Sequence, residues 1–209
     1  MVITGPGTLE LAQKMITFEP SKITIIVNDY NSLITMRYRL GKSGAGNTEI
    51  RMMEYENTDF RNESIDILFA QASVSSPGRN KIIKEFKKIL KTGGIACIGE
   101  IVKLKDNPPA FVKDIWQSSD LQPLSESEIE KFYSEKGFEI LGKKDISFTL
   151  KDFYRQSEKM LKQEISDWSD EEKTYNKKLL KKISHESNVY LKLGGNEFMG
   201  FTVLIMRKK

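Results

Sequence analysis

The chain has 209 residues, of which 33 are basic and 29 acidic, and 39% are hydrophobic. This length suits one domain with room for an inserted cap, and the composition is that of a globular protein rather than a disordered one. The net charge of +4 is compatible with an anionic ligand but does not require nucleic acid as a partner.

Targeting signals are missing from the sequence. No apolar run reaches the roughly 18 residues of a transmembrane helix, and no basic-then-apolar segment precedes the first apolar run. We therefore expect a cytoplasmic protein with no membrane partner.

The chain has a single cysteine, Cys97, and a single histidine, His185. A disulfide framework or a Cys/His zinc site is therefore impossible within one chain, and we expect no metal. Cys97 falls within an apolar run and is interpreted as a small buried residue. His185 lies at the polar end of a predicted helix, and we assign it no catalytic role.

A short apolar run at the start of the chain leads into Gly5-Pro6-Gly7, and Leu9 to Met15 then has a helical pattern. Glycine permits positive φ and lets a ligand approach the backbone closely. The helix that follows directs free N–H groups at the turn. Two readings remain open here, a nucleotide-type site and an ordinary strand–helix turn.

The next apolar run, Ile23 to Val27, favours the nucleotide reading because Asp29 follows it. An acid about 20 residues beyond a glycine turn, at the end of the second strand, can accept hydrogen bonds from a ribose. This unit therefore predicts half of a nucleoside pocket. The alternative is that Asp29 is a solvated loop acid, and the same alternative applies to Glu54, which follows the third predicted strand.

Further strands and helices alternate as far as residue 102. We predict helices over 31–40 and 80–91, strands over 49–53, 64–70 and 95–102, and a surface turn over 41–47. Such alternation indicates a parallel sheet with helices on both faces. Ligands of such sheets bind at the carboxyl ends of the strands. The residues at those ends are Gly5, Asp29, Glu54, Gln71 and Glu100.

The pattern changes after residue 102. The sequence predicts a loop over 103–122, a helix over 125–135 and a strand over 138–147. Two helices over 149–168 and 169–184 follow, and a strand over 198–206 closes the chain. We predict a core formed by 1–147 and 197–209, with 148–196 as an inserted helical lid.

Four segments together resemble the class I S-adenosylmethionine-dependent methyltransferases of the small-molecule type. They are the Gly5-Pro6-Gly7-Thr8 turn, Asp29 after the second strand, the ungapped stretch from Glu54 to Phe69, and the helix-then-Gly-Gly stretch from Phe86 to Gly94. The resemblance extends from Val2 to about Leu141, and the last strand fits the family's closing strand. The sequence departs from the family at Ile3, where an acid is usual, at Leu9, where a third glycine is common, and at Thr92, where proline is usual.

The resemblance implies a Rossmann-like, mostly parallel, seven-stranded sheet with helices on both faces and a helical lid inserted before the last strand. It implies S-adenosylmethionine as the cofactor. Gly5 and Gly7 would face its methionine part, Asp29 would hold the ribose hydroxyls, Glu54 and Tyr55 would flank the adenine, and Ala70 and Gln71 would lie near the methyl group. The full set of implied cofactor contacts is Gly5, Pro6, Gly7, Asp29, Tyr30, Glu54, Tyr55, Ala70 and Gln71.

Methyl transfer from a sulfonium needs alignment and exclusion of water, so the lack of an obvious catalytic constellation is compatible with it. We expect a small-molecule acceptor, contacted by Gln71, Ser73, Trp116, Phe153 and Tyr154, and a monomer or homodimer. The alternative for Gln71 is a polar strand end, and the alternative for the aromatic residues is packing of helices on the sheet. Lysines between 172 and 182 are interrupted by acids, so a nucleic-acid partner is not expected. The alternative functions are an RNA or protein methyltransferase and a methyltransferase-like binding subunit without catalysis.

Overall fold

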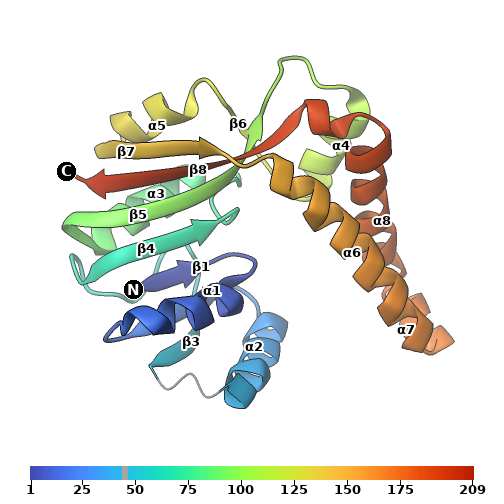
Figure 1. Ribbon diagram of the computed structural model, residues 1–209, viewed down its shortest axis with the longest axis horizontal. Coiled ribbons are helices and arrows are strands. Elements are labelled where there is room, and N and C mark those ends of the chain that lie inside the picture. The colour runs from blue at the N-terminus through green and yellow to red at the C-terminus, as the bar shows by residue number, and fades with distance from the viewer. Residues whose placement is uncertain (44–46) are drawn as a thin grey trace. The chain divides into compact units, whose positions relative to one another are not determined.

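The computed structural model describes residues 1–43 and 47–209, and the strands of these residues form one eight-stranded sheet (Figure 1). The path through the sheet is β3-β2-β1-β4-β5-β8-β7, and β6 pairs with β5 off this path. The predicted Rossmann-like class is confirmed, and the eighth strand is the two-residue β6, which the sequence did not indicate. The strands are β1 (Val2–Thr4), β2 (Ile23–Val27), β3 (Thr48–Met52), β4 (Ile65–Gln71), β5 (Leu90–Lys103), β6 (Leu124–Ser125), β7 (Phe138–Asp145) and β8 (Met199–Lys208).

The sheet is parallel from β3 to β5. Strand β1 lies between β2 and β4, with Ile3 opposite Ile25 on one side and Phe69 on the other. Strand β8 runs against its neighbours β5 and β7 (Figure 1). Because β1, β2 and β4 are parallel and in register, the residues that follow them emerge at the same edge of the sheet.

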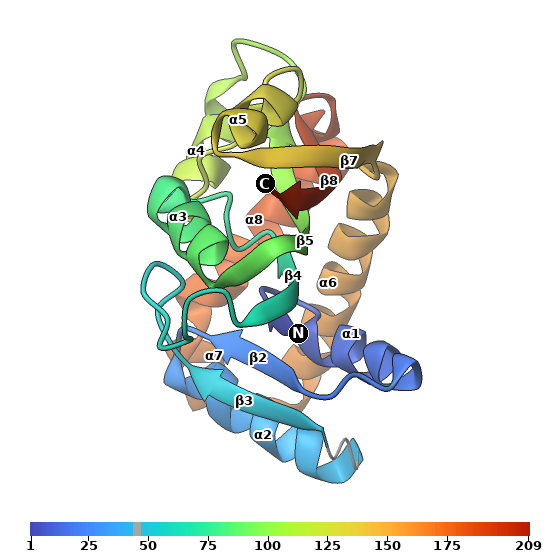
Figure 2. The ribbon, with the colours of Figure 1, turned by 90° about the vertical axis from the view of Figure 1, so that its left-hand side faces the viewer.

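Helices connect most of the strands. α1 and α3 lie on opposite faces of the sheet (Figure 2). The helices are α1 (Thr8–Met15), α2 (Tyr30–Ser43), α3 (Arg79–Ile89), α4 (Ala110–Ser118), α5 (Ile129–Glu135), α6 (Phe148–Asp167), α7 (Asp170–Tyr175) and α8 (Lys177–Lys192), with 3₁₀ turns at Ile16–Phe18 and Gly195–Glu197.

A hydrophobic cluster joins α1 and α2 to the same face of the sheet. Leu9 of α1 and Leu33 of α2 are buried in it with Ile3, Ile25 and Ile50 from β1, β2 and β3. The register of the strands pairs Ile3 with Ile25 and Ile25 with Ile50, which places the three side chains on one face of the sheet. This packing fixes where α1 and α2 begin relative to the strand ends, and therefore where the turns before them lie.

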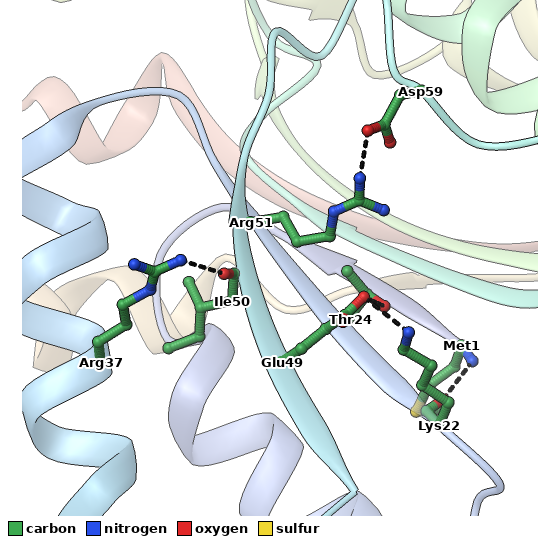
Figure 3. A network of polar contacts seen from close by, with 8 residues as sticks. All are labelled: Met1, Lys22, Thr24, Arg37, Glu49, Ile50, Arg51 and Asp59. Carbon is green, nitrogen blue, oxygen red and sulfur yellow. Dashed lines mark hydrogen bonds and ion pairs between the residues drawn. The ribbon is translucent and has the colours of Figure 1, made fainter.

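Polar contacts tie the β2–β3 edge together (Figure 3). Glu49 of β3 accepts a hydrogen bond from Thr24 of β2 at 3.0 Å and pairs with Lys22 at 3.0 Å. Arg51, further along β3, pairs with Asp59 in the segment that follows the strand. Exposed ion pairs of this kind each contribute about 0–1 kcal/mol, so they orient the strand edge more than they stabilise it.

The glycine pair at 93–94 does not end α3 in the predicted way. The helix ends at Ile89, and β5 starts at once with Leu90, before the glycines. Between Ile65 and Ile67 of β4 the partner on β5 jumps from Leu90 to Ile95, so the residues between bulge out of the ladder. The glycines therefore mark an irregularity inside the strand rather than a loop before it.

Three further boundaries were predicted wrongly. The predicted loop over 103–122 contains α4, which starts directly after Pro109 and buries Val112 and Ile115. The predicted helix over 125–135 starts only at Ile129, because Leu124 and Ser125 pair with the end of β5. The predicted helix over 169–184 is two helices, and the second continues to Lys192.

In the predicted turn over 41–47, residues 41–43 belong to α2 and residues 44–46 lie outside the described residues.

Contacts divide the chain into two compact units. The first unit comprises residues 1–100, 128–144 and 203–209, and the second comprises 101–127 and 145–202. The first contains the carboxyl ends of β1 to β4, and the second contains α4 and α6 to α8. The predicted lid over 148–196 falls within the second unit, and its role as a lid stays a prediction. None of the helices that the structure describes has the length and apolar character needed to span a membrane.

Candidate active site

The turn after β1 is built by two glycines with different surroundings. Gly5 has a φ of 95°, and a Cβ added to it would lie 1.8 Å from the carbonyl oxygen of Gln71, at the end of β4. Gly7 has a φ of 71°, and no described atom lies within 4 Å of where its Cβ would be. Pro6, between them, is exposed. The turn is therefore packed against β4 on one side and open on the other.

Tyr55 connects this turn to the segment after β3. The backbone N–H of Gly5 is near enough to the Tyr55 hydroxyl to lower the pKa of the phenol, and the side chain is half-buried. The pKa of Tyr55 is raised to about 12, mainly by burial, with the carboxylates of Asp29 and Glu54 adding to the rise and the Gly5 N–H opposing it. Three of the other residues implied as cofactor contacts thus act on one phenol.

Asp29 has a local structural role as well as an exposed carboxylate. Its Oδ1 accepts the backbone N–H of Ser32 at 2.8 Å, and its carbonyl accepts the N–H of Leu33, so Asp29 caps the start of α2. The hydrogen bonds from Ser32 lower the pKa of this carboxyl. Asp29 is therefore a charged, orientated acid at the end of β2 rather than a loose loop residue. Tyr30, the first residue of α2, is exposed.

Glu54 lies in a tight turn after β3. Its backbone pairs with Asn57 in an isolated bridge, with the Asn57 N–H donating to the Glu54 carbonyl at 3.2 Å. The Glu54 side chain is exposed, and its charge acts on the Tyr55 phenol. Glu54 and Asp29 therefore stand on the same rim, as the order of parallel strands predicts.

The end of β4 contributes backbone and side-chain groups. The Ala70 side chain is buried, so only its backbone is available to a ligand, whereas Gln71 is exposed. Ser73 forms a hydroxyl–hydroxyl hydrogen bond of 2.7 Å with the buried Thr4 at the end of β1. Gln71 and Ser73 are therefore held beside the glycine turn, within the first unit.

The other residues predicted to contact an acceptor lie in the second unit. Trp116 of α4 is half-buried, and its Nε1 has no hydrogen-bond partner among the described residues. Tyr154 of α6 stacks on Tyr190 of α8 with ring centroids 4.5 Å apart, which is helix packing. Phe153, its neighbour in α6, is 54% exposed. The residues predicted to contact an acceptor are therefore divided between the units. Gln71 and Ser73 belong to the first unit, and Trp116, Phe153 and Tyr154 belong to the second.

Sequence reasoning missed a buried network at the end of β5. Glu100 is fully buried, and its Oε2 accepts from Arg79 Nη2 at 2.8 Å and from Ser75 Oγ at 3.0 Å. Tyr133 of α5 donates to its Oε1. Arg79 and Ser75 belong to the segment that follows Gln71, so the network anchors that segment to β5. The available signal was the acid Glu100 near the end of an apolar strand.

The single cysteine and the single histidine lie on β5 and α8, respectively. Cys97 in β5 is half-buried, and burial raises the pKa of its thiol, which keeps it protonated. His185 in α8 is exposed. Among the residues that the structure describes, no three histidine, cysteine, aspartate or glutamate side chains are grouped as a metal site would require.

Comparison with known proteins shows the class of the fold. No protein-family model and no curated protein matches the sequence. Solved structures do match, and they are class I S-adenosylmethionine-dependent methyltransferases and their structural relatives. The chain therefore has the methyltransferase fold that its motifs resemble.

Three of these structures illustrate the range. The [4+2]-cyclase SpnF superimposes with a TM-score of 0.78 at 16% identity, covering 99% of this chain and 73% of SpnF. A putative sarcosine dimethylglycine methyltransferase from Galdieria sulphuraria gives 0.78 at 16%, covering 100% and 77%. A phosphoethanolamine N-methyltransferase of Haemonchus contortus, solved with S-adenosylhomocysteine, gives 0.78 at 13%. This chain covers 48% of that last structure. At these identities the likeness defines the fold alone, and it includes a cyclase.

Proposed function

We propose that the chain is an S-adenosylmethionine-dependent methyltransferase that acts on a small molecule. The observation that carries the proposal is the Tyr55 phenol, which lies near the Gly5 N–H and in the field of Asp29 and Glu54. The glycine turn, the acid expected to hold the ribose and the residues expected to flank the adenine follow three different strands, β1, β2 and β3. Their convergence at one edge of the sheet is the arrangement expected of a nucleoside pocket.

The residues at this edge fit the cofactor. The open side of Gly7 leaves space for a ligand to approach the backbone, and the exposed Asp29 carboxylate offers acceptors to the ribose hydroxyls. Glu54 and Tyr55 would flank the adenine. When bound, S-adenosylmethionine supplies a methyl group that is already activated for displacement.

The chain's own contribution would be alignment and exclusion of water. Gln71 and Ser73 stand beside the glycine turn and are the first-unit candidates for contact with the acceptor. A general base is needed only for an acceptor that must lose a proton, and we assign no catalytic residue.

Each of two alternative functions, a binding subunit and an RNA methyltransferase, is supported by one observation. Ile3 is buried in the core beneath the turn where the family usually has an acid, which favours a binding subunit that no longer catalyses. Lys177, Lys178 and Lys181 are exposed on α8, which leaves room for an RNA substrate. Nucleic-acid binding through such lysines would weaken steeply with salt, and binding to a small acceptor would not.

Calorimetric titration of the purified chain with S-adenosylmethionine and with S-adenosylhomocysteine tests the proposal. Micromolar binding of both would support the cofactor site and justify a screen of acceptors. Cofactor binding without transfer to any acceptor, including RNA and protein, would favour the binding subunit. Absence of binding to either compound would reject the enzyme proposal for this chain.

A further inference from the structure

The second unit contains a cavity of about 310 Å³ between α6 and α8. Its apolar walls are the side chains of Phe153, Tyr154, Met160, Leu161 and Ile183. This volume falls at the lower end of the range of small-molecule pockets, about 300–1,000 Å³.

One wall of the cavity contains a buried hydroxyl that lacks a partner. Ser187 of α8 is 2% exposed, and its Oγ forms no hydrogen bond with any described residue. A buried hydroxyl without a hydrogen bond is unfavourable because it has lost water and gained nothing in return. A polar group in that condition beside a cavity indicates a place where a ligand atom can bind.

The neighbouring residue supplies a negative charge. Glu186 also lines the cavity, and its Oε1 accepts from Ser119 Oγ of the α4–β6 connection at 2.5 Å. The Nζ of Lys182 lies 4.0 Å from the same oxygen and balances part of its charge. The carboxylate is close enough to Tyr154 to help burial raise the pKa of that phenol. The cavity therefore has one polar end, formed by Glu186 and Ser187, and an apolar remainder.

We propose that this cavity binds a small apolar molecule that carries one hydrogen-bond-donating group, an amine or a hydroxyl. The head group donates to the acceptors of the polar end, the Ser187 hydroxyl and the Glu186 carboxylate. The hydrocarbon body lies against the aromatic and aliphatic walls. Phe153 is 54% exposed and Met160 is 59% exposed, so two large apolar walls are only partly covered and an apolar body would bury more of them.

This inference does not rest on the proposed function, because every contact it uses lies within the second unit. Its test uses three probes of one shape, 2-phenylethylamine, 2-phenylethanol and ethylbenzene, without any cofactor. The readout is the shift of ¹³C-labelled methyl resonances of Met160 and Ile183 during titration of the full chain. These two methyl groups line the cavity from α6 and α8 respectively.

Saturable shifts at both methyl groups, with the amine or the alcohol binding about 3- to 10-fold more tightly than ethylbenzene, are expected from one additional hydrogen bond. Tighter binding of the amine alone assigns the head group as an amine, and tighter binding of the alcohol alone assigns it as a hydroxyl. Equal binding of all three probes, or no shift, would overturn the proposal.

Substitutions distinguish binding in the cavity from nonspecific hydrophobic binding elsewhere on the chain. Ser187→Ala should reduce the advantage over ethylbenzene, whereas Ser184→Ala, an exposed serine on the same helix outside this cavity, should preserve it. Ser157→Trp places a large side chain in the cavity and should abolish the shifts, and it serves the test if Ser187→Ala does not fold. Shifts that persist in a folded Ser157→Trp variant would reject the cavity as the site.

Discussion

The hydroxyl of Tyr55 lies near the backbone N–H of Gly5, so the segment after β3 meets the turn after β1. The two residues are 50 positions apart in the sequence, and parallel strands bring them to one edge of the sheet. This proximity places a phenol beside the glycine turn, in the field of two acids. It is the relationship on which the proposed nucleoside pocket depends.

The ionisation of Tyr55 provides a prediction about pH. Its pKa is about 12 in the folded chain, mainly because of burial, against 10.0 for a free tyrosine. Because the folded pKa is the higher one, Tyr55 contributes stability below pH 10 that is lost as the pH rises towards 12. Urea unfolding at pH 9 and pH 11 should therefore show a smaller decrease in stability for Tyr55→Phe than for the unmodified chain. An identical decrease in both proteins would contradict the burial of this phenol.

The two glycines of the first turn should respond differently to alanine. Gly5→Ala combines a positive φ with a Cβ 1.8 Å from the Gln71 carbonyl oxygen, so we expect a loss of about 3–5 kcal/mol in the free energy of unfolding. Gly7→Ala has the positive φ but free space, and should cost about 1–2 kcal/mol. Urea denaturation of both variants measures the difference. Equal losses would mean that the Gly5–Gln71 contact is not as close as described.

The buried ion pair at the end of β5 should be sensitive to loss of one charge. Glu100→Gln removes the buried negative charge that pairs with Arg79, which should cost about 3–5 kcal/mol. Glu10→Gln is the matched control, because Glu10 pairs with Arg39 on the surface and should contribute about 0–1 kcal/mol. Chemical denaturation of the two variants makes the comparison. Similar small effects at both positions would indicate that Glu100 is not the buried anchor of the segment after β4.

The two roles of Asp29 can be separated by substitution. Asp29→Asn keeps a good helix cap and should leave stability nearly unchanged, whereas Asp29→Ala removes the Ser32 contact and should cost about 1 kcal/mol. If Asp29 also holds the ribose, both variants should bind S-adenosylmethionine more weakly, and Asp29→Ala should be the weaker of the two. Calorimetry and thermal unfolding of the same samples provide the two readouts. Unchanged affinity in Asp29→Ala would remove Asp29 from the proposed pocket and leave only its capping role.

Several elements could be predicted from local pattern. The strand–glycine–helix start, the acid after β2 and the buried strands depend on the period of apolar residues and on glycine, which act over a few neighbours. A parallel sheet then follows from the alternation of strands and helices, and with it the prediction that Asp29 and Glu54 share one rim. This is why the fold class and the candidate cofactor rim were both accessible without coordinates.

Elements that depend on distant partners were missed. β6 exists because Leu124 and Ser125 pair with the end of β5, and nothing in two residues indicates a strand. α4 has only Val112 and Ile115 as buried residues and follows a proline pair, so its local signal resembled a loop. The glycines at 93 and 94 do break regular structure, but the flanking residues still pair with β4, and the break becomes a bulge inside β5.

The sequence by itself determined a parallel sheet with helices on both faces, because the alternation of strands and helices follows from local periodicity. The resemblance of its motifs to a known family added the Rossmann-like class and the expectation of a nucleoside pocket. Only the tertiary structure decided which side chains meet. It placed the Tyr55 hydroxyl near Gly5, buried Glu100 with Arg79, and left the Ser187 hydroxyl beside a cavity with no hydrogen-bond partner among the described residues. Each of these contacts joins residues or surfaces that are brought together by packing, and no pattern within one element encodes its partner on another.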